Sequence, residues 1–264
     1  MLDQQQLDEQ LMPVADDAPK LDILYQDDNL VAVNKPSGLF VHRSYLDRDQ
    51  RYFALQLVRD LVGCYVYPVH RLDRPTSGVL LFALDQQTAR AMGQAFTDKT
   101  VDKTYYAITR GHLVGSGQVD YPIQEKLDKL GDKFVGEDLP AKPAVTDYYC
   151  VNTATLPIAV GKYPSVRYSL MRLMPHTGRR HQIRRHLAHL RYPIIGDINY
   201  GDNKQNPFFA EHFGVKRLML HAYKLQFVHP HSGEQICITA PIDHHWRQVF
   251  NALDWHQQAQ QLAQ

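Results

Sequence analysis

The sequence predicts an α+β fold, in which helices flank a mixed, largely antiparallel sheet. Two features favour this class. Short apolar or β-branched runs bounded by turn residues are typical of strands, and apolar residues at helical spacing are typical of helices. The chain has 264 residues, enough for one large domain or two small ones with a substantial core. The arrangement we expect is a single domain.

The first predicted elements are a β-hairpin and a helix. Residues 1–20 are rich in Gln and Asp and show too little apolar periodicity for a packed element, so we expect a mobile tail. Beyond them, two apolar runs flank a polar turn at 27–29, which predicts a hairpin. Apolar residues at helical spacing over 53–61 predict a helix that packs on the sheet.

A turn carrying one carboxylate precedes a short apolar run. Residues 70–78 read His-Arg-Leu-Asp-Arg-Pro-Thr-Ser-Gly and are followed by the apolar run 79–84, which is short enough to be a buried strand. Asp73 therefore lies between two arginines in a turn that a strand would hold in place. An aspartate in a turn is more often structural than catalytic, because its side chain bonds nearby backbone N–H groups. From composition alone both roles stay open.

The rest of the chain continues the alternation of strands and helices. Asp85 is a candidate N-cap for a helix that runs to about residue 96, and the β-branched and aromatic segment 103–108 predicts a strand. We expect loops and short strands over 111–165. A helix is then expected to begin at Thr177 or Gly178, before two closing strands, a terminal helix over 243–253 and a Gln-rich tail.

Charge is distributed unevenly in a nearly neutral chain of net charge +1. Residues 167–191 contain seven arginines and no acid, which makes them a candidate surface for an anionic ligand; the alternative is a solvated arginine-rich helix face. The three cysteines are scattered, which predicts neither a disulfide framework nor a zinc site and fits the cytoplasm. No apolar run approaches about 18 residues, so we expect no membrane insertion.

Three motifs together resemble the RluA-type pseudouridine synthase family. Residues 70–78 resemble its active-site motif, in which the aspartate is the essential catalytic residue. Lys103 and Tyr105 resemble its K-x-Y motif, and residues 177–184, Thr-Gly-Arg-Arg-His-Gln-Ile-Arg, resemble its third motif. The resemblance covers roughly residues 21–245. It implies a pseudouridine synthase fold, with residues 21–255 as the catalytic domain.

The resemblance also implies roles for particular residues. Asp73 is the expected catalytic carboxylate, Tyr105 the tyrosine that stacks on the target base, and Arg184 the ion-pair partner of Asp73. Leu220 is expected to line the base pocket. The predicted RNA-binding residues are Arg71, Arg179, Arg180, His181 and Arg185. The reaction retains all atoms, so we expect no cofactor and no metal, and the expected partner is a tRNA bound by a monomer.

Within the family, the sequence is most similar to the branch that modifies uridine 65 of tRNA. One alternative is the same chemistry on ribosomal RNA. Another is a catalytically silent RNA-binding module, which the presence of all three expected catalytic residue types disfavours. A third is a metal-dependent hydrolase, prompted by four histidines between 176 and 189; these lack an H-E-x-x-H pattern and lie among arginines, which oppose a dication.

Overall fold

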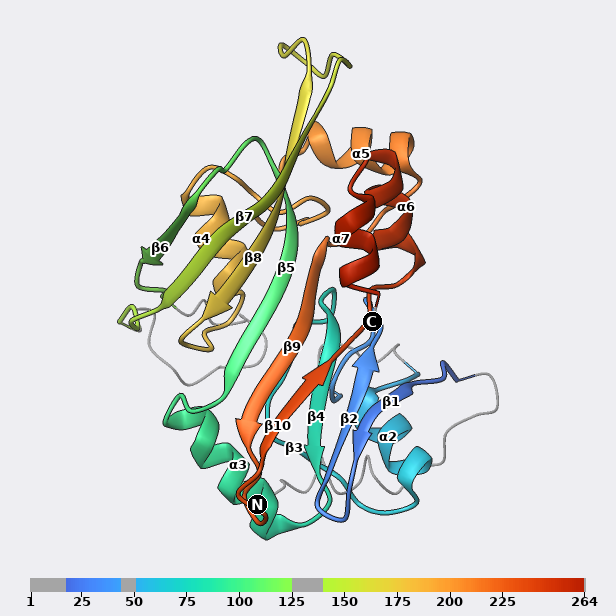
Figure 1. Ribbon diagram of the computed structural model, residues 1–264, viewed down its shortest axis with the longest axis vertical. Coiled ribbons are helices and arrows are strands. Elements are labelled where there is room, and N and C mark those ends of the chain that lie inside the picture. The colour runs from blue at the N-terminus through green and yellow to red at the C-terminus, as the bar shows by residue number, and fades with distance from the viewer. Residues whose placement is uncertain (1–17, 44–50, 125–139, 264) are drawn as a thin grey trace. The chain divides into compact units, whose positions relative to one another are not determined.

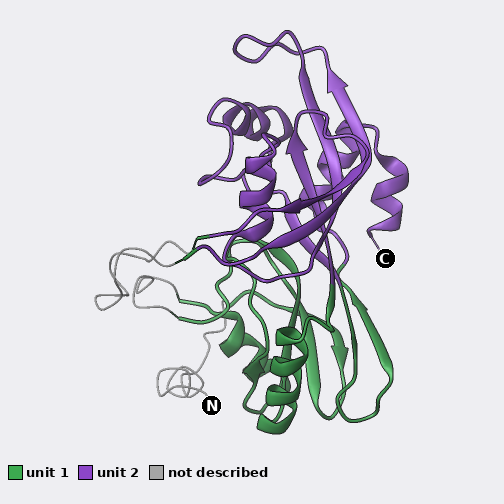
Figure 2. Ribbon diagram, turned by 90° about the vertical axis from the view of Figure 1, so that its left-hand side faces the viewer, with its two compact units in different colours: residues 1–102, 124–140, 225–240 green, residues 103–123, 141–224, 241–264 purple. Residues whose placement is uncertain are grey.

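The structure is a computed structural model that describes residues 18–43, 51–124 and 140–263. Its described part forms two compact units: the described residues up to 102 with 124, 140 and 225–240, and residues 103–123, 141–224 and 241–263 (Figure 2). The predicted tail, as far as residue 17, lies outside the described residues.

The first unit is built on a hairpin and a buried strand. The antiparallel hairpin predicted around the turn at 27–29 is confirmed, and its second strand pairs with the apolar run after the Asp73 turn (Figure 1). That run is fully buried, which explains why it does not alternate with polar residues. The elements of this unit are β1 (Asp22–Gln26), β2 (Leu30–Lys35), α2 (Ala54–Val62), β3 (Tyr67–Pro68), β4 (Ser77–Ala83), α3 (Gln86–Thr97) and β10 (Gln235–Thr239).

Local sequence signals set the helices of this unit. Asp85 is the N-cap of α3, where its side chain accepts a hydrogen bond from the Thr88 backbone N–H at 2.8 Å, as predicted. The apolar face of α2 is buried, and the helix ends at Gly63 in the left-handed conformation that favours glycine. Met92 of α3 joins a core cluster with residues of β2 and β4.

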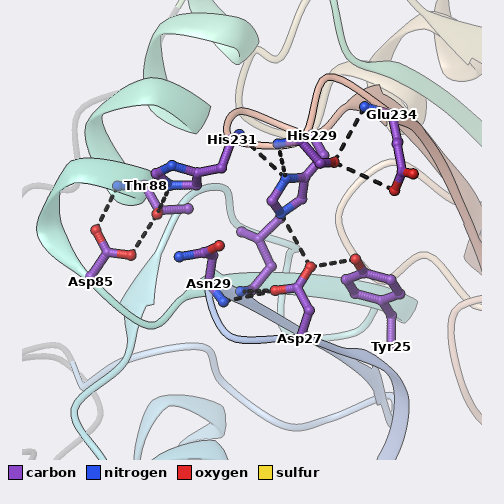
Figure 3. Close-up of polar contacts among 10 residues, drawn as sticks. Tyr25, Asp27, Asn29, Asp85, Thr88, His229, His231 and Glu234 are labelled. Atoms are coloured by element: carbon purple, nitrogen blue, oxygen red, sulfur yellow. Dashed lines mark hydrogen bonds and ion pairs between the residues drawn. The ribbon is translucent and has the colours of Figure 1, made fainter.

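A polar network lies at the turn between β1 and β2 (Figure 3). Asp27 accepts hydrogen bonds from the Tyr25 hydroxyl and from the backbone N–H groups of Asn29 and Leu30, the latter two at 2.8 and 2.7 Å. His229 Nε2 lies 3.1 Å from the Asp27 carboxylate. Burial alone would raise the pKa of Asp27, but these hydrogen bonds lower it below its ordinary value. The turn is therefore fixed by one charged group.

A second polar chain joins α3 to the turn before β10. The Thr88 hydroxyl donates to Asp85 at 2.5 Å and lies 2.7 Å from His231 Nε2 (Figure 3). Because His231 comes from a distant part of the sequence, this contact ties residues 225–240 to the N-terminal part of the same unit. Sequence patterns give no local signal for it.

The second unit contains four antiparallel strands in the order β5-β8-β7-β6, with helices beside them. Aromatic residues of α5 and α6 fill its core, where Phe209 and Phe213 pack against the buried Tyr168 of β8. The elements are β5 (Asp102–Arg110), β6 (Ser116–Asp120), β7 (Val145–Leu156), β8 (Val166–Pro175), α4 (Gln182–His189), α5 (Gln205–Phe213), α6 (His244–Ala252), α7 (His256–Gln261) and β9 (Leu220–Val228), which continues into the first unit from residue 225 on.

Two expectations for the strands and the C-terminal tail of this unit were wrong. Strand β7 has 12 residues where short strands were expected, and it forms a long hairpin with β8 (Figure 1). Its pairing partner lies beyond the connecting loop, so the length of the strand depends on a non-local contact. The predicted Gln-rich tail contains the short helix α7, whose Gln258 accepts a hydrogen bond from the Asn152 side-chain amide at 3.2 Å.

The fold class is as predicted. The described strands form a mixed ten-stranded sheet flanked by helices, an α+β fold. Among the described helices, none is both long and apolar enough to cross a lipid bilayer.

Candidate active site

The Asp73 turn of the first unit is a hydrogen-bonded turn directly before β4. The backbone N–H of Thr76 donates to the Asp73 carbonyl at 3.0 Å, and the Asp73 residue is half-buried. At the start of the motif, His70 Nε2 accepts a hydrogen bond from the Leu81 backbone N–H at 3.0 Å. Its ring stacks on Phe96 of α3 with the ring centroids 5.0 Å apart. The motif is thus held at both ends.

A buried lysine holds the chain beside this turn. Lys35, at the end of β2, is fully buried, and its Nζ donates to the carbonyl oxygens of Pro36, Leu39 and Arg74 at 2.9, 2.8 and 3.1 Å. The Gly38 backbone N–H donates to the same Arg74 carbonyl at 2.8 Å. An amino group with three donors matches three carbonyl oxygens. Lys35 therefore fixes the main chain immediately after Asp73.

The arginines on either side of Asp73 are both exposed. Arg74 lies over the Phe40 ring at 4.5 Å, and its Nε donates to the Gly38 carbonyl at 3.1 Å, so it also packs on the segment that Lys35 holds. Arg71 is the predicted RNA contact of the pair. Its exposure leaves its guanidinium accessible to a phosphate or a base.

Tyr105 and Leu220 belong to one apolar cluster of the second unit. Tyr105 is a half-buried residue of β5 and pairs with Leu173 of β8. Leu220, the first residue of β9, is 3% exposed and lies in the same cluster, which also contains Ile183 of α4. The predicted base-stacking tyrosine thus packs against the same apolar core that contains the predicted pocket leucine.

Arg184 has a bidentate partner that the motifs do not name. On α4, its Nε donates to Asp197 Oδ2 at 2.8 Å and its Nη2 donates to Asp197 Oδ1 at 2.9 Å. The two side chains are 3% and 1% exposed. Burial alone would raise the pKa of Asp197, but the Arg184 guanidinium and the backbone N–H groups of Asn199 and Tyr200 lower it below its ordinary value. The pair is therefore charged. The expected pairing of Arg184 with Asp73, which belongs to the other unit, stays a prediction.

The start of α4 is not where the sequence predicts it. The helix begins at Gln182, several residues after Thr177 and Gly178. Thr177 instead donates through its hydroxyl to Gln182 Oε1 at 2.6 Å and accepts from the Val145 backbone N–H at 3.1 Å. The Gln182 amide donates in turn to the Val145 carbonyl and the Thr146 hydroxyl, both at 2.9 Å. These contacts hold residues 177–181 against β7 as a non-helical turn.

The four histidines that prompted a metal site each contact other side chains or main-chain groups of the second unit. His176 lies 2.6 Å from Asp147, His181 lies 3.0 Å from the Tyr200 hydroxyl, and His189 stacks on Tyr121. The fourth, His186, is 1% exposed and lies 3.0 Å from both the Thr146 hydroxyl and the Tyr121 carbonyl. Burial lowers the pKa of His186 below its ordinary value, so the neutral ring is favoured.

The predicted RNA-binding residues of the second unit lie on and just before α4. Arg180 is exposed, whereas Arg179 and Arg185 are half-buried, and Arg179 donates through Nε to the Pro143 carbonyl at 3.3 Å. His181 has a left-handed backbone with φ of 56°. The sequence motifs do not single out Lys35 and Asp197, because the burial and the contacts of these two side chains leave no local sequence pattern.

Comparison with known proteins identifies the family of the chain. Residues 29–189 match the model of the RNA pseudouridylate synthase family. The chain belongs to this family. A protein of Pasteurella multocida (strain Pm70) named tRNA pseudouridine synthase C is 54% identical over 235 residues, which cover 89% of this chain and 97% of that protein. The protein of the same name from Vibrio cholerae is 48% identical over 90% of this chain and 97% of its own length.

Solved structures of the family have the same fold. The human RNA pseudouridylate synthase domain containing 4 protein superimposes with a TM-score of 0.65 and 28% identity, over 88% of this chain and 92% of that chain. The human domain containing 1 protein gives a TM-score of 0.64 over 92% of this chain and 98% of its own. The pseudouridine synthase fold expected from the motifs is therefore confirmed.

Proposed function

We propose that this chain isomerises a uridine of tRNA to pseudouridine, and that uridine 65 is its target. The observation that carries the proposal is the name shared by relatives that are 48–54% identical over almost their entire length, tRNA pseudouridine synthase C. Residues 21–255 are the proposed catalytic domain, acting as a cytoplasmic monomer.

The reaction requires three changes and conserves every atom. The bond between uracil N1 and the ribose C1′ breaks, the uracil rotates, and a bond forms between C5 and C1′. The proton then leaves C5, and N1 gains a proton. No electron carrier or energy source is needed for this balance. The residues must therefore supply charge, orientation and proton transfer.

Asp73 is proposed to supply the charge. A carboxylate can stabilise electron deficiency at the sugar or attack it as a nucleophile, and both roles are compatible with a half-buried position in a fixed turn. Arg184 is proposed to favour the charged form of Asp73 and to orient it.

Tyr105 and Leu220 are proposed to receive the flipped base. A uridine inside stacked RNA must leave the stack before chemistry can reach its glycosidic bond. An aromatic ring beside an apolar surface suits an extruded base, and Tyr105 lies in the apolar cluster that contains Leu220. The guanidinium groups of Arg71, Arg179, Arg180 and Arg185, with the His181 ring, are proposed to contact the RNA around the target.

The test is tritium release from RNA labelled with [5-³H]uridine, measured with bulk tRNA and with ribosomal RNA for the wild type and Asp73→Asn. We expect release from tRNA by the wild type, and a loss of at least about 10³-fold in the variant, because the amide carries no charge and is a poor nucleophile. Mapping the product in tRNA then tests uridine 65. Release from ribosomal RNA alone would overturn the substrate, and no release from either RNA would leave a silent RNA-binding module.

A further inference from the structure

The pair between Arg184 and Asp197 is built into a rigid frame. Besides the guanidinium, Asp197 Oδ1 accepts hydrogen bonds from the backbone N–H groups of Asn199 and Tyr200, at 2.9 and 3.0 Å. The Asn206 amide donates to the Asp197 carbonyl at 2.9 Å, while its oxygen accepts from the Gly196 N–H at 2.9 Å. The Asp197 carboxylate, the Asp197 carbonyl and the Gly196 N–H are thus all held by partners from the same unit.

Close backbone approach restricts the same segment further. Gly196 has φ of 77°, and a Cβ placed on it would overlap the Arg217 carbonyl. A Cβ on Gly201 would overlap the Asp197 carbonyl itself. Only glycine fits at both positions, so the main chain on either side of Asp197 is packed against other backbone. A carboxylate fixed in this way can impose one orientation on a planar guanidinium.

We propose that Asp197 is a positioning residue for pseudouridine formation, which sets the orientation of the Arg184 guanidinium through its two parallel hydrogen bonds. The inference rests on the proposed function, in which Arg184 acts on Asp73. Tyr200 supports the same geometry, because the Arg184 guanidinium lies 5.3 Å from its ring centroid. Asp197 touches no reacting atom in this proposal; it acts through Arg184 alone.

The chain offers a matched control in Asp202. Its Oδ1 accepts the backbone N–H groups of Lys204 and Gln205 at 2.8 and 2.9 Å, and its Oδ2 accepts from Arg110 Nη1 at 2.6 Å. This is the same turn with an arginine added, but the two side chains are 34% and 22% exposed and Arg110 has no proposed role. Asp202→Asn therefore removes an equivalent pair without touching Arg184.

The experiment compares Asp197→Asn, Asp202→Asn and Asp73→Asn for single-turnover tritium release, tRNA affinity and thermal melting. We expect Asp197→Asn to bind tRNA as the wild type does while its rate falls by about 100-fold, since small misplacements of a catalytic group cost this much. In the wild type, the buried Arg184 Nε–H should give a slowly exchanging signal in a ¹⁵N spectrum. This signal should disappear in Asp197→Asn. Asp202→Asn should keep its rate within about twofold.

The outcomes separate the inference from the proposed function. A normal rate in folded Asp197→Asn, with Asp73→Asn inactive, overturns the inference and leaves the function intact. A normal rate in Asp73→Asn overturns the proposed role of Asp73 instead. If Asp197→Asn does not fold, Asp197→Glu keeps the buried charge but displaces the carboxylate; a reduced rate with full tRNA binding then supports the inference, and a full rate overturns it.

Discussion

Lys35 in the first unit and Asp197 in the second are both buried charged side chains beside a proposed catalytic residue, but they bind different kinds of group. The Nζ of Lys35 donates to three backbone carbonyl oxygens around the Asp73 turn. Asp197 accepts from the Arg184 guanidinium itself. Lys35 therefore fixes the main chain around the Asp73 turn, whereas Asp197 fixes the Arg184 side chain. Substitution of Lys35 should therefore lower stability and activity together, whereas substitutions at the Arg184 pair should first lower the rate.

The largest expected effect is that of Lys35→Met, which keeps the length of the side chain and removes its donors. The Pro36 and Leu39 carbonyl oxygens lose their Lys35 donor, whereas the Arg74 carbonyl keeps the Gly38 N–H. Each buried polar group left unsatisfied costs about 1–3 kcal/mol. We expect the free energy of unfolding in urea to fall by about 3 kcal/mol or more, with tritium release lost in step.

The control is Lys216→Met, at an exposed lysine of the second unit, which should leave the unfolding midpoint unchanged. A Lys35→Met protein that keeps the wild-type unfolding midpoint but has no activity would instead mean that Lys35 takes part in the chemistry directly. Lys35 would then not differ from Asp197 in acting mainly through stability.

The next effect is that of Arg184→Lys. A single ammonium cannot reproduce two parallel hydrogen bonds to Asp197, so the charge would remain while its orientation is lost. We expect kcat to fall by about 100-fold, or about 2.7 kcal/mol, with KM for tRNA little changed. Arg110→Lys is the matched control, because Arg110 pairs with Asp202 at the surface. Equal losses in both variants would mean that the buried pair is only structural.

His186 should make the stability of the second unit depend on pH. Its folded pKa lies below the ordinary value of 6.5 because burial disfavours the charged ring. Between the folded and the unfolded pKa of His186, the ring is therefore protonated in the unfolded chain and neutral in the folded chain. This contribution to stability is fully present above about pH 6.5 and is lost as the pH falls towards the folded pKa, with a slope of at most about 1.4 kcal/mol per pH unit.

The measurement is urea unfolding between pH 5 and 7.5 for the wild type, His186→Gln and His189→Asn. Glutamine can still donate to the Tyr121 carbonyl but does not titrate in this range. His186→Gln should flatten the dependence. His189→Asn should weaken it only slightly, because burial is the main cause of the lowered pKa of His186 and the charge of His189 is a lesser one. An unaltered slope in His186→Gln would assign the dependence to another group.

Predictions from the sequence succeeded where the determinant was local. The N-cap at Asp85, the buried strand after the Asp73 turn and the hairpin around Asp27 each depend on residues within a few positions. The start of α4 depends instead on Thr177 and Gln182 binding β7, more than thirty residues earlier in the chain. No periodicity in 177–189 encodes such a contact, so the helix was placed too early.

The candidate site shows the same division. The catalytic roles of Asp73, Tyr105 and Arg184 came from motif resemblance and stay predictions, although the turn at Asp73 and the strand at Tyr105 were expected from local pattern. Lys35 is different, because lysine is almost never fully buried and one of its acceptors lies 39 residues away. Its role follows only from three-dimensional contacts.

The smallest expected effect concerns the surface arginines. Arg180 is exposed just before α4 and is predicted to contact RNA phosphates, whereas Arg90 is exposed on α3 of the first unit. Each phosphate contact releases counterions, so Arg180→Ala should reduce the slope of log affinity against log salt by about 1. The measurement is tRNA binding by filter retention from 50 to 300 mM salt, with Arg90→Ala expected to keep the wild-type slope. If both variants keep it, Arg180 is a solvated side chain that makes no phosphate contact, and its proposed RNA-binding role is overturned.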